Sequence, residues 1–128
     1  SQSGGMLGFS LYPHHLNDNS NCKLDNFCEM VARTAEIMDV KNLGIGSDLC
    51  LNQPDEIVEW MRNGTWTKKK VYGEGILNNV GFPDQPSWFK DARGFKNIES
   101  GLKKIGFISD EINGILGNNW YNFYKGIN

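Results

Sequence analysis

Two short apolar segments separated by an amphipathic stretch define the first part of this 128-residue chain. Residues 5–12, GMLGFSLY, and residues 42–48, NLGIGSD, each have the length of a strand that is buried on both faces. Between them, apolar side chains such as Phe27 and Val31 recur at helical spacing over residues 25–39. A strand, a helix and a second strand within about 45 residues predict a crossover unit with two parallel strands.

The second part of the chain predicts helices around a long loop. Pro54 suits the first turn of a short helix that ends at Gly64. Residues 65–94 keep neither a helical nor a strand period and are rich in aromatic residues, glycine and proline, which predicts a long aromatic loop. Two further helices are predicted at residues 95–105 and 109–124. The length is typical of one domain, so we expect all 128 residues to form a single domain.

Composition and charge argue against several classes of function. The formal net charge is −2, and the densest basic run, Lys68-Lys69-Lys70, is too short to form a nucleic-acid or membrane-binding stripe. The sequence shows neither an apolar run of membrane-spanning length nor a signal peptide. We therefore expect a cytoplasmic protein that binds neither nucleic acid nor membranes.

The cysteines point to a reducing compartment. Cys22, Cys28 and Cys50 are odd in number and lack CxxC spacing, which argues against a disulfide framework or a closed thiolate zinc site. Cys28 lies on the inner side of the first predicted helix, so we expect it to be a small core residue and not a nucleophile.

A carboxylate follows the second apolar segment. In parallel α/β proteins, catalytic groups lie where strands end at their carboxyl side, and Asp48 has that position. The alternative is that Asp48 caps the next turn through its own backbone. Its position in the sequence favours neither interpretation over the other.

Two histidines lie on the polar loop after the first apolar segment. His14 and His15, with Asp48 and Cys50 at the same strand ends, are the residues to consider for a metal site. Adjacent histidines on a strand point to opposite sides, and on a loop they rarely chelate one ion together, so we favour a plain polar loop. The aromatic side chains of the long loop form either part of a substrate mouth or a satellite cluster, and we favour the cluster; they are Trp66, Tyr72, Trp88 and Phe89.

Several segments, in the same order, resemble the C-terminal part of the membrane (renal) dipeptidase family of zinc amidohydrolases. The first is SGGMLGFSLYP at residues 3–13. The second is the predicted helix together with the LGIGSD that follows it at residues 43–48. The third is IGFISDEINGILGNNWYNFY at residues 105–124. The most specific elements are GIGSD and the ending Gly117-Asn118-Asn119-Trp120. The resemblance covers nearly the whole chain.

The resemblance implies a (β/α)₈ barrel. Residues 5–12 would be its seventh strand, residues 25–39 the helix that follows, and residues 42–48 its eighth strand. A complete barrel needs about 250 residues. The expected fold is therefore α/β, the C-terminal part of a TIM-barrel metallohydrolase with its last two parallel strands and helices, incomplete on its own.

The chemistry that the resemblance implies is hydrolysis of the peptide bond of a dipeptide by a hydroxide held between two zinc ions. Asp48 matches the acidic residue that protonates the departing amine, and Tyr12, His14 and His15 would lie at the active-site rim as substrate contacts. The zinc ligands of the family precede the region that this chain matches, so we assign no metal ligand here.

Two functions remain open. The leading one is the C-terminal portion of a zinc dipeptidase-like hydrolase, inactive as an isolated chain. The alternative is a non-catalytic α/β scaffold or oligomeric binding module. In either case the bare apolar strands are expected to make copies of the chain associate.

Overall fold

The computed structural model describes residues 4–49, 51, 54, 56–57, 60 and 83–127. The chain divides into two compact units, Ser1–Leu49 with Gln85–Asn128, and Cys50–Asp84. Most of the second unit lies outside the described residues, including residues 61–82 of the predicted short helix and aromatic loop. The expectation of a single domain therefore stays a prediction, and each unit is considered by itself.

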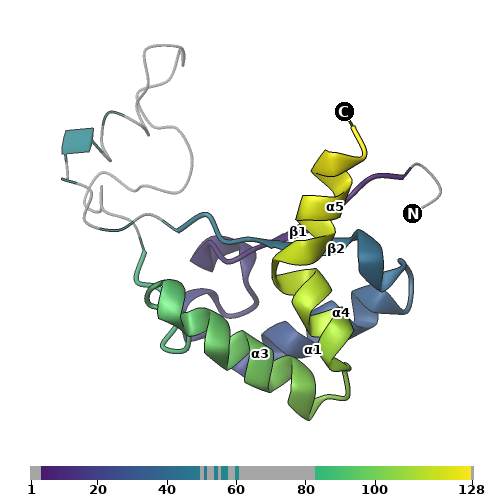
Figure 1. Ribbon diagram of the computed structural model, residues 1–128. Helices are drawn as coiled ribbons and strands as arrows, with labels where there is room; N and C mark the ends of the chain where they lie inside the picture. The colour runs from purple at the N-terminus through teal and green to yellow at the C-terminus, as the bar shows by residue number, and fades with distance from the viewer. Residues whose placement is uncertain are drawn as a thin grey trace. The chain divides into compact units, whose positions relative to one another are not determined.

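A parallel pair of strands organises the first unit (Figure 1). β1 spans Leu7–Ser10 and β2 spans Leu43–Gly46, with Leu7 opposite Leu43 and Ser10 opposite Gly46. Both strands lie inside the segments predicted from the sequence, and the predicted parallel pairing is confirmed. The carboxyl ends of the two strands consequently meet at one edge of the sheet.

One α-helix and three short 3₁₀ turns connect the strands. The turns η1 Pro13–His15 and η2 Asn19–Asn21 precede α1, Leu24–Ala35. The predicted end of this helix at residue 39 is wrong, because the chain turns after Ala35 and forms η3, Val40–Asn42. The Asp39 carboxylate accepts a bond from the Lys41 backbone N–H at 3.1 Å, a local bond that competes with helical hydrogen bonding.

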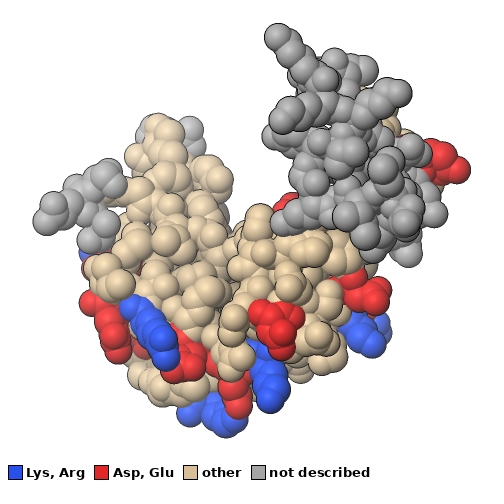
Figure 2. Space-filling view, turned by 180° about the vertical axis from the view of Figure 1, so that it is seen from behind, with Lys and Arg blue, Asp and Glu red and all other residues tan. Residues whose placement is uncertain are grey.

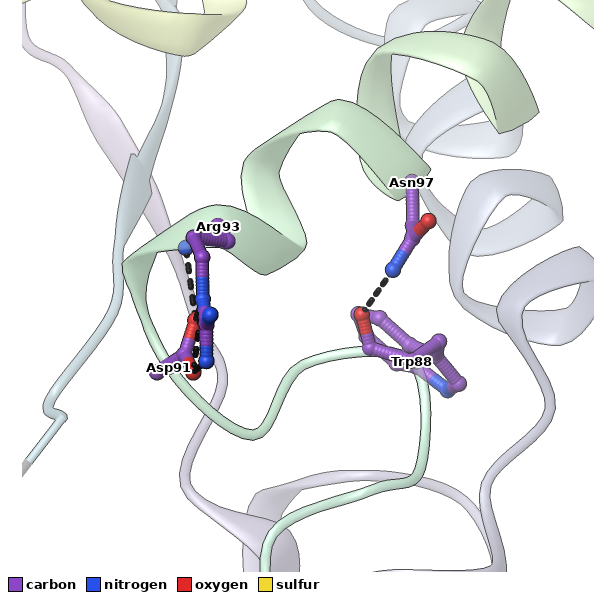
Figure 3. Close-up of polar contacts among 4 residues, drawn as sticks. All are labelled: Trp88, Asp91, Arg93 and Asn97. Atoms are coloured by element: carbon purple, nitrogen blue, oxygen red, sulfur yellow. Dashed lines mark hydrogen bonds and ion pairs between the residues drawn. The ribbon is translucent and has the colours of Figure 1, made fainter.

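A short 3₁₀ turn leads into the helix α3. The turn η4, Ala92–Gly94, shortens the predicted loop 65–94, and α3 follows at Phe95–Lys104. The Asp91 carboxylate accepts bonds from the Arg93 backbone N–H at 2.8 Å and from its Nε at 3.0 Å (Figure 3). These bonds hold the pKa of Asp91 at about 2.

The single helix predicted at residues 109–124 is divided into three segments. α4 spans Ser109–Asn113, a π-helical turn η5 spans Gly114–Asn118, and α5 spans Asn119–Lys125. Gly117 leaves the helical conformation, with φ 171° and ψ −35°. The chain is therefore kinked at Gly117, between the residues of α4 and those of α5. The sequence did not predict this break, because apolar residues recur at helical spacing across it.

Close packing of α1 and α3 forms one layer of the core. Phe27, Cys28 and Val31 are buried on α1. A Cβ on Gly101 of α3 would lie 2.6 Å from the Cys28 Sγ, so the two helices approach as closely as they do because residue 101 is glycine. Cys28 is a core residue as predicted, and its pKa is raised to about 11, first by burial and then by the charge of Asp25.

Hydrogen bonds of Trp88 hold the loop before α3 against the layer of α1 and α3. The indole Nε1 of Trp88 donates to the Cys22 carbonyl at 2.7 Å, and the Asn97 side-chain amide donates to the Trp88 carbonyl at 2.7 Å (Figure 3). Trp88 and Phe89 are buried in the core. Of the predicted aromatic loop, the described part therefore packs as a cluster under the helices.

Side chains of the C-terminal segment dock on β2. Asn119 is buried, and its Nδ2 donates to the carbonyl oxygens of Val40 at 2.9 Å and Leu43 at 2.8 Å. Trp120 Nε1 donates to the Ile45 carbonyl at 3.1 Å. A Cβ on Gly44 would overlap this indole, which therefore lies directly against the strand.

We predict that Gly44→Ala destabilises the protein by about 1–3 kcal/mol, because the added methyl group would collide with Trp120 in a well-packed site. Gly46→Ala on the same strand is the matched control. Apart from the chain neighbours of Gly46, no described residue has an atom within 4 Å of a Cβ at position 46, so the effect of this substitution should stay below about 1 kcal/mol. Urea unfolding followed by circular dichroism measures both, and equal losses would contradict the packing described here.

A second prediction concerns Asp91. Its folded-state pKa lies below the unfolded value of about 4, so its contribution to stability is present above about pH 4 and is lost as the pH falls through about 2. We expect Asp91→Asn to lower the Tm at pH 7, with the difference from the wild type narrowing as the buffer is acidified from pH 4. Arg93→Gln should reproduce part of the effect. A Tm difference that does not change with pH would show that the pair contributes nothing through its charge.

Candidate functional site

The loops that follow the two strands carry all four predicted site residues. Tyr12, His14 and His15 follow β1, and Asp48 follows β2. Because the strands are parallel and in register, the loops leave the sheet at the same edge. The structure brings the Tyr12 ring into contact with both histidines and places Asp48 after the neighbouring strand.

The two histidines share an aromatic neighbour but have different hydrogen-bond partners. The Tyr12 ring lies edge-to-face with both, at centroid distances of 5.6 Å to His14 and 5.3 Å to His15. His14 Nδ1 is 3.1 Å from the Asn19 Oδ1, whereas His15 Nδ1 is 3.0 Å from the Ser10 Oγ. The η1 turn thus directs the two Nδ1 atoms to different sides of the loop.

Asp48 occupies an uncommon backbone conformation. Its φ is 52°, in the left-handed region, and its side chain is exposed. Aspartate and asparagine tolerate this region better than other non-glycine residues, and such conformations concentrate at functional sites. The turn after β2 therefore presents an accessible carboxyl group at the edge where the histidine loop also lies.

Sequence reasoning missed Ser10, the last residue of β1. Its Oγ lies 3.0 Å from His15 Nδ1 and accepts a bond from the Tyr12 backbone N–H at 3.1 Å. The available signal was a serine at a strand end, followed five residues later by a histidine across a Pro-initiated turn. Ser10 and His15 come into contact because the η1 turn brings the chain back toward the end of β1.

The described residues do not fit a two-zinc centre. Within them, no three side chains from histidine, cysteine, aspartate and glutamate are grouped so that they could hold one ion. Cys22 and Cys28 are buried, and burial raises the pKa of both thiols, which opposes the thiolate form that zinc requires.

The rest of the described surface is mixed in character. A groove of about 480 Å³ runs along α1 and contains none of the predicted site residues; Asn26, Met30 and Arg33 are among its lining residues. Figure 2 shows acidic and basic side chains interspersed over one face, without a continuous stripe of one sign. None of the helices among the described residues has the length and apolar character needed to cross a bilayer.

Comparison with known proteins supports the fold class. No protein-family profile and no curated protein matches this sequence. Among solved structures, a crystal structure of an amidohydrolase from Pseudomonas aeruginosa is similar, with a TM-score of 0.75 and 22% sequence identity. The match covers 95% of this chain and 36% of that chain, so this chain spans about a third of the length of the amidohydrolase. The fold is accordingly mixed α/β and amidohydrolase-like, consistent with part of a barrel.

We predict that the 128-residue chain does not retain two tightly bound zinc ions, since its described residues offer no shared ligand cluster. The measurement is elemental analysis after incubation with zinc sulfate and exhaustive dialysis. Retention of two equivalents would show that ligands are assembled in a way the described residues do not reveal.

Proposed function

We propose that this chain is part of a zinc-dependent, dipeptidase-type hydrolase in which Asp48 donates a proton to the leaving amine. The observation that carries the proposal is the position of Asp48 directly after β2, at the edge shared with the Tyr12 and histidine loop. The amidohydrolase-like fold and the ordered sequence segments that resemble the membrane dipeptidase family support it.

The proposed role follows from the chemistry of amide cleavage. An amine leaves a tetrahedral intermediate only after its nitrogen gains a proton, and a carboxylic acid at the rim of the site is suited to supply it. Asp48 is exposed, so a substrate nitrogen can approach it. In this proposal the Asp48 carboxylate accepts the proton that the attacking water loses and passes it to the nitrogen of the leaving amine.

The neighbouring loop is proposed to contact the substrate. The imidazoles of His14 and His15 and the phenol of Tyr12 offer hydrogen-bonding groups that suit the polar ends of a dipeptide. The Tyr12 ring packs against both imidazoles, which holds the three side chains close together. Zinc ligands would come from residues other than those described here, and self-association of the chain stays a prediction that light scattering tests.

The test is a dipeptide hydrolysis assay on the protein expressed from the complete reading frame that contains these residues. We expect Asp48→Asn to lower kcat by about 10²-fold or more, with an unchanged zinc content, because the variant removes a proton donor and not a ligand. Asparagine also tolerates the left-handed backbone of residue 48, so stability should be little affected.

Glu99→Gln is the matched control, since it also exchanges a carboxyl group for an amide but on the exposed surface of α3. Its kcat should equal that of the wild type. Loss of zinc in Asp48→Asn would assign the residue a ligand role instead. Absence of dipeptide hydrolysis by the zinc-supplied wild-type protein would refute the proposed substrate class.

A further inference from the structure

Ser10 has no role in the proposed dipeptidase chemistry, in which His15 only contacts the substrate, yet the two side chains are hydrogen-bonded to each other. Ser10 ends β1, and His15 ends the η1 turn, so two regular elements fix the backbone on either side of the contact. The Ser10 Oγ and His15 Nδ1 are 3.0 Å apart, within the range of a nucleophile that is hydrogen-bonded to its base.

The hydrogen bonds around Ser10 leave its hydroxyl proton available for His15. A hydroxyl has one proton to donate and two lone pairs that accept. The backbone N–H of Tyr12 can only donate, so the Ser10 Oγ is the acceptor of that 3.1 Å bond. In the tautomer that carries the ring proton on Nε2, the Ser10 O–H donates to the bare His15 Nδ1, and this is the tautomer that a general base at Nδ1 requires.

The surroundings leave the pair open to a small molecule. Ser10 is partly exposed and His15 is exposed. The residue opposite Ser10 on β2 is Gly46, and among the described residues none beyond its chain neighbours has an atom within 4 Å of the place where a side chain would begin there. The Tyr12 ring, edge-to-face against His15 with centroids 5.3 Å apart, restrains the imidazole from another side.

We propose that Ser10 and His15 act as a nucleophile and a general base that accept the acyl group of small activated esters. The Ser10 Oγ attacks the carbonyl carbon while its proton passes to His15 Nδ1. The alcohol of the ester leaves with that proton, and an acyl group remains bonded to the Ser10 Oγ. A water molecule then attacks this carbonyl and gives a proton to His15, which returns it to the Ser10 Oγ as the acid is released.

This chemistry needs neither a metal nor Asp48, so it is tested separately from the dipeptidase proposal. The 128-residue chain is treated with p-nitrophenyl acetate in the presence of EDTA. We expect an initial release of p-nitrophenolate, together with an acetyl group that mass spectrometry of proteolytic peptides locates on Ser10. Acetyl groups found only on lysine side chains or the N-terminus would overturn the proposal.

Two variants test the roles of the pair. Ser10→Ala should lose the initial release. Ser100→Ala should keep it, because the Ser100 hydroxyl donates to the Lys96 carbonyl of its own helix at 2.9 Å and has no histidine partner among the described residues. His15→Gln should slow acetylation of Ser10 by about 10²-fold or more, as expected on loss of a general base. An unchanged rate in His15→Gln would show that the contact is only a structural hydrogen bond.

Circular dichroism establishes whether each variant folds. Should Ser10→Ala fail to fold, the location of the acetyl group on the wild-type chain and the rate for His15→Gln still decide the outcome. Ser10→Cys supplies a further check, because a thiol at this position should also become acetylated if His15 acts as the base.

Discussion

The packing of Trp120 against β2 is the constraint on which the rest of the first unit depends. Its indole lies so close to Gly44 that no side chain fits there, and it donates a hydrogen bond to the Ile45 carbonyl. Asn119 adds two bonds to backbone carbonyls at and before the start of β2. Each buried hydrogen bond contributes about 1 kcal/mol, and an unpaired buried amide would cost more, so these two residues fix the C-terminal segment to the strand.

The two faces of the sheet are covered by different parts of the chain. Successive side chains on a strand point to opposite faces. On β1, Phe9 contacts Phe27 of α1, with ring centroids 6.2 Å apart, whereas a Cβ on the adjacent Gly8 would lie 3.0 Å from the Trp120 ring. The strands are thus held between α1 and the C-terminal segment, whose helix α5 passes in front of them in Figure 1.

This arrangement explains why the strand ends are suited to chemistry. The middle of each strand is held by packing, and the carboxyl ends continue into short turns with polar side chains. Ser10, His15 and Asp48 therefore project from a supported edge although each lies on or beside a loop. A supported backbone with accessible side chains is the usual arrangement of groups that bind or react.

Local patterns in the sequence determined the approximate positions of the strands, α1 and α3, because strand and helix periods depend on neighbouring residues. They also placed Asp48 at a strand end. Tertiary structure decided what local patterns do not carry: the kink at Gly117 within the last predicted helix, the docking of Asn119 and Trp120 on β2, and the approach of His15 to Ser10. These features depend on contacts between residues that no helical or strand repeat relates to one another, and such contacts form only when the chain folds.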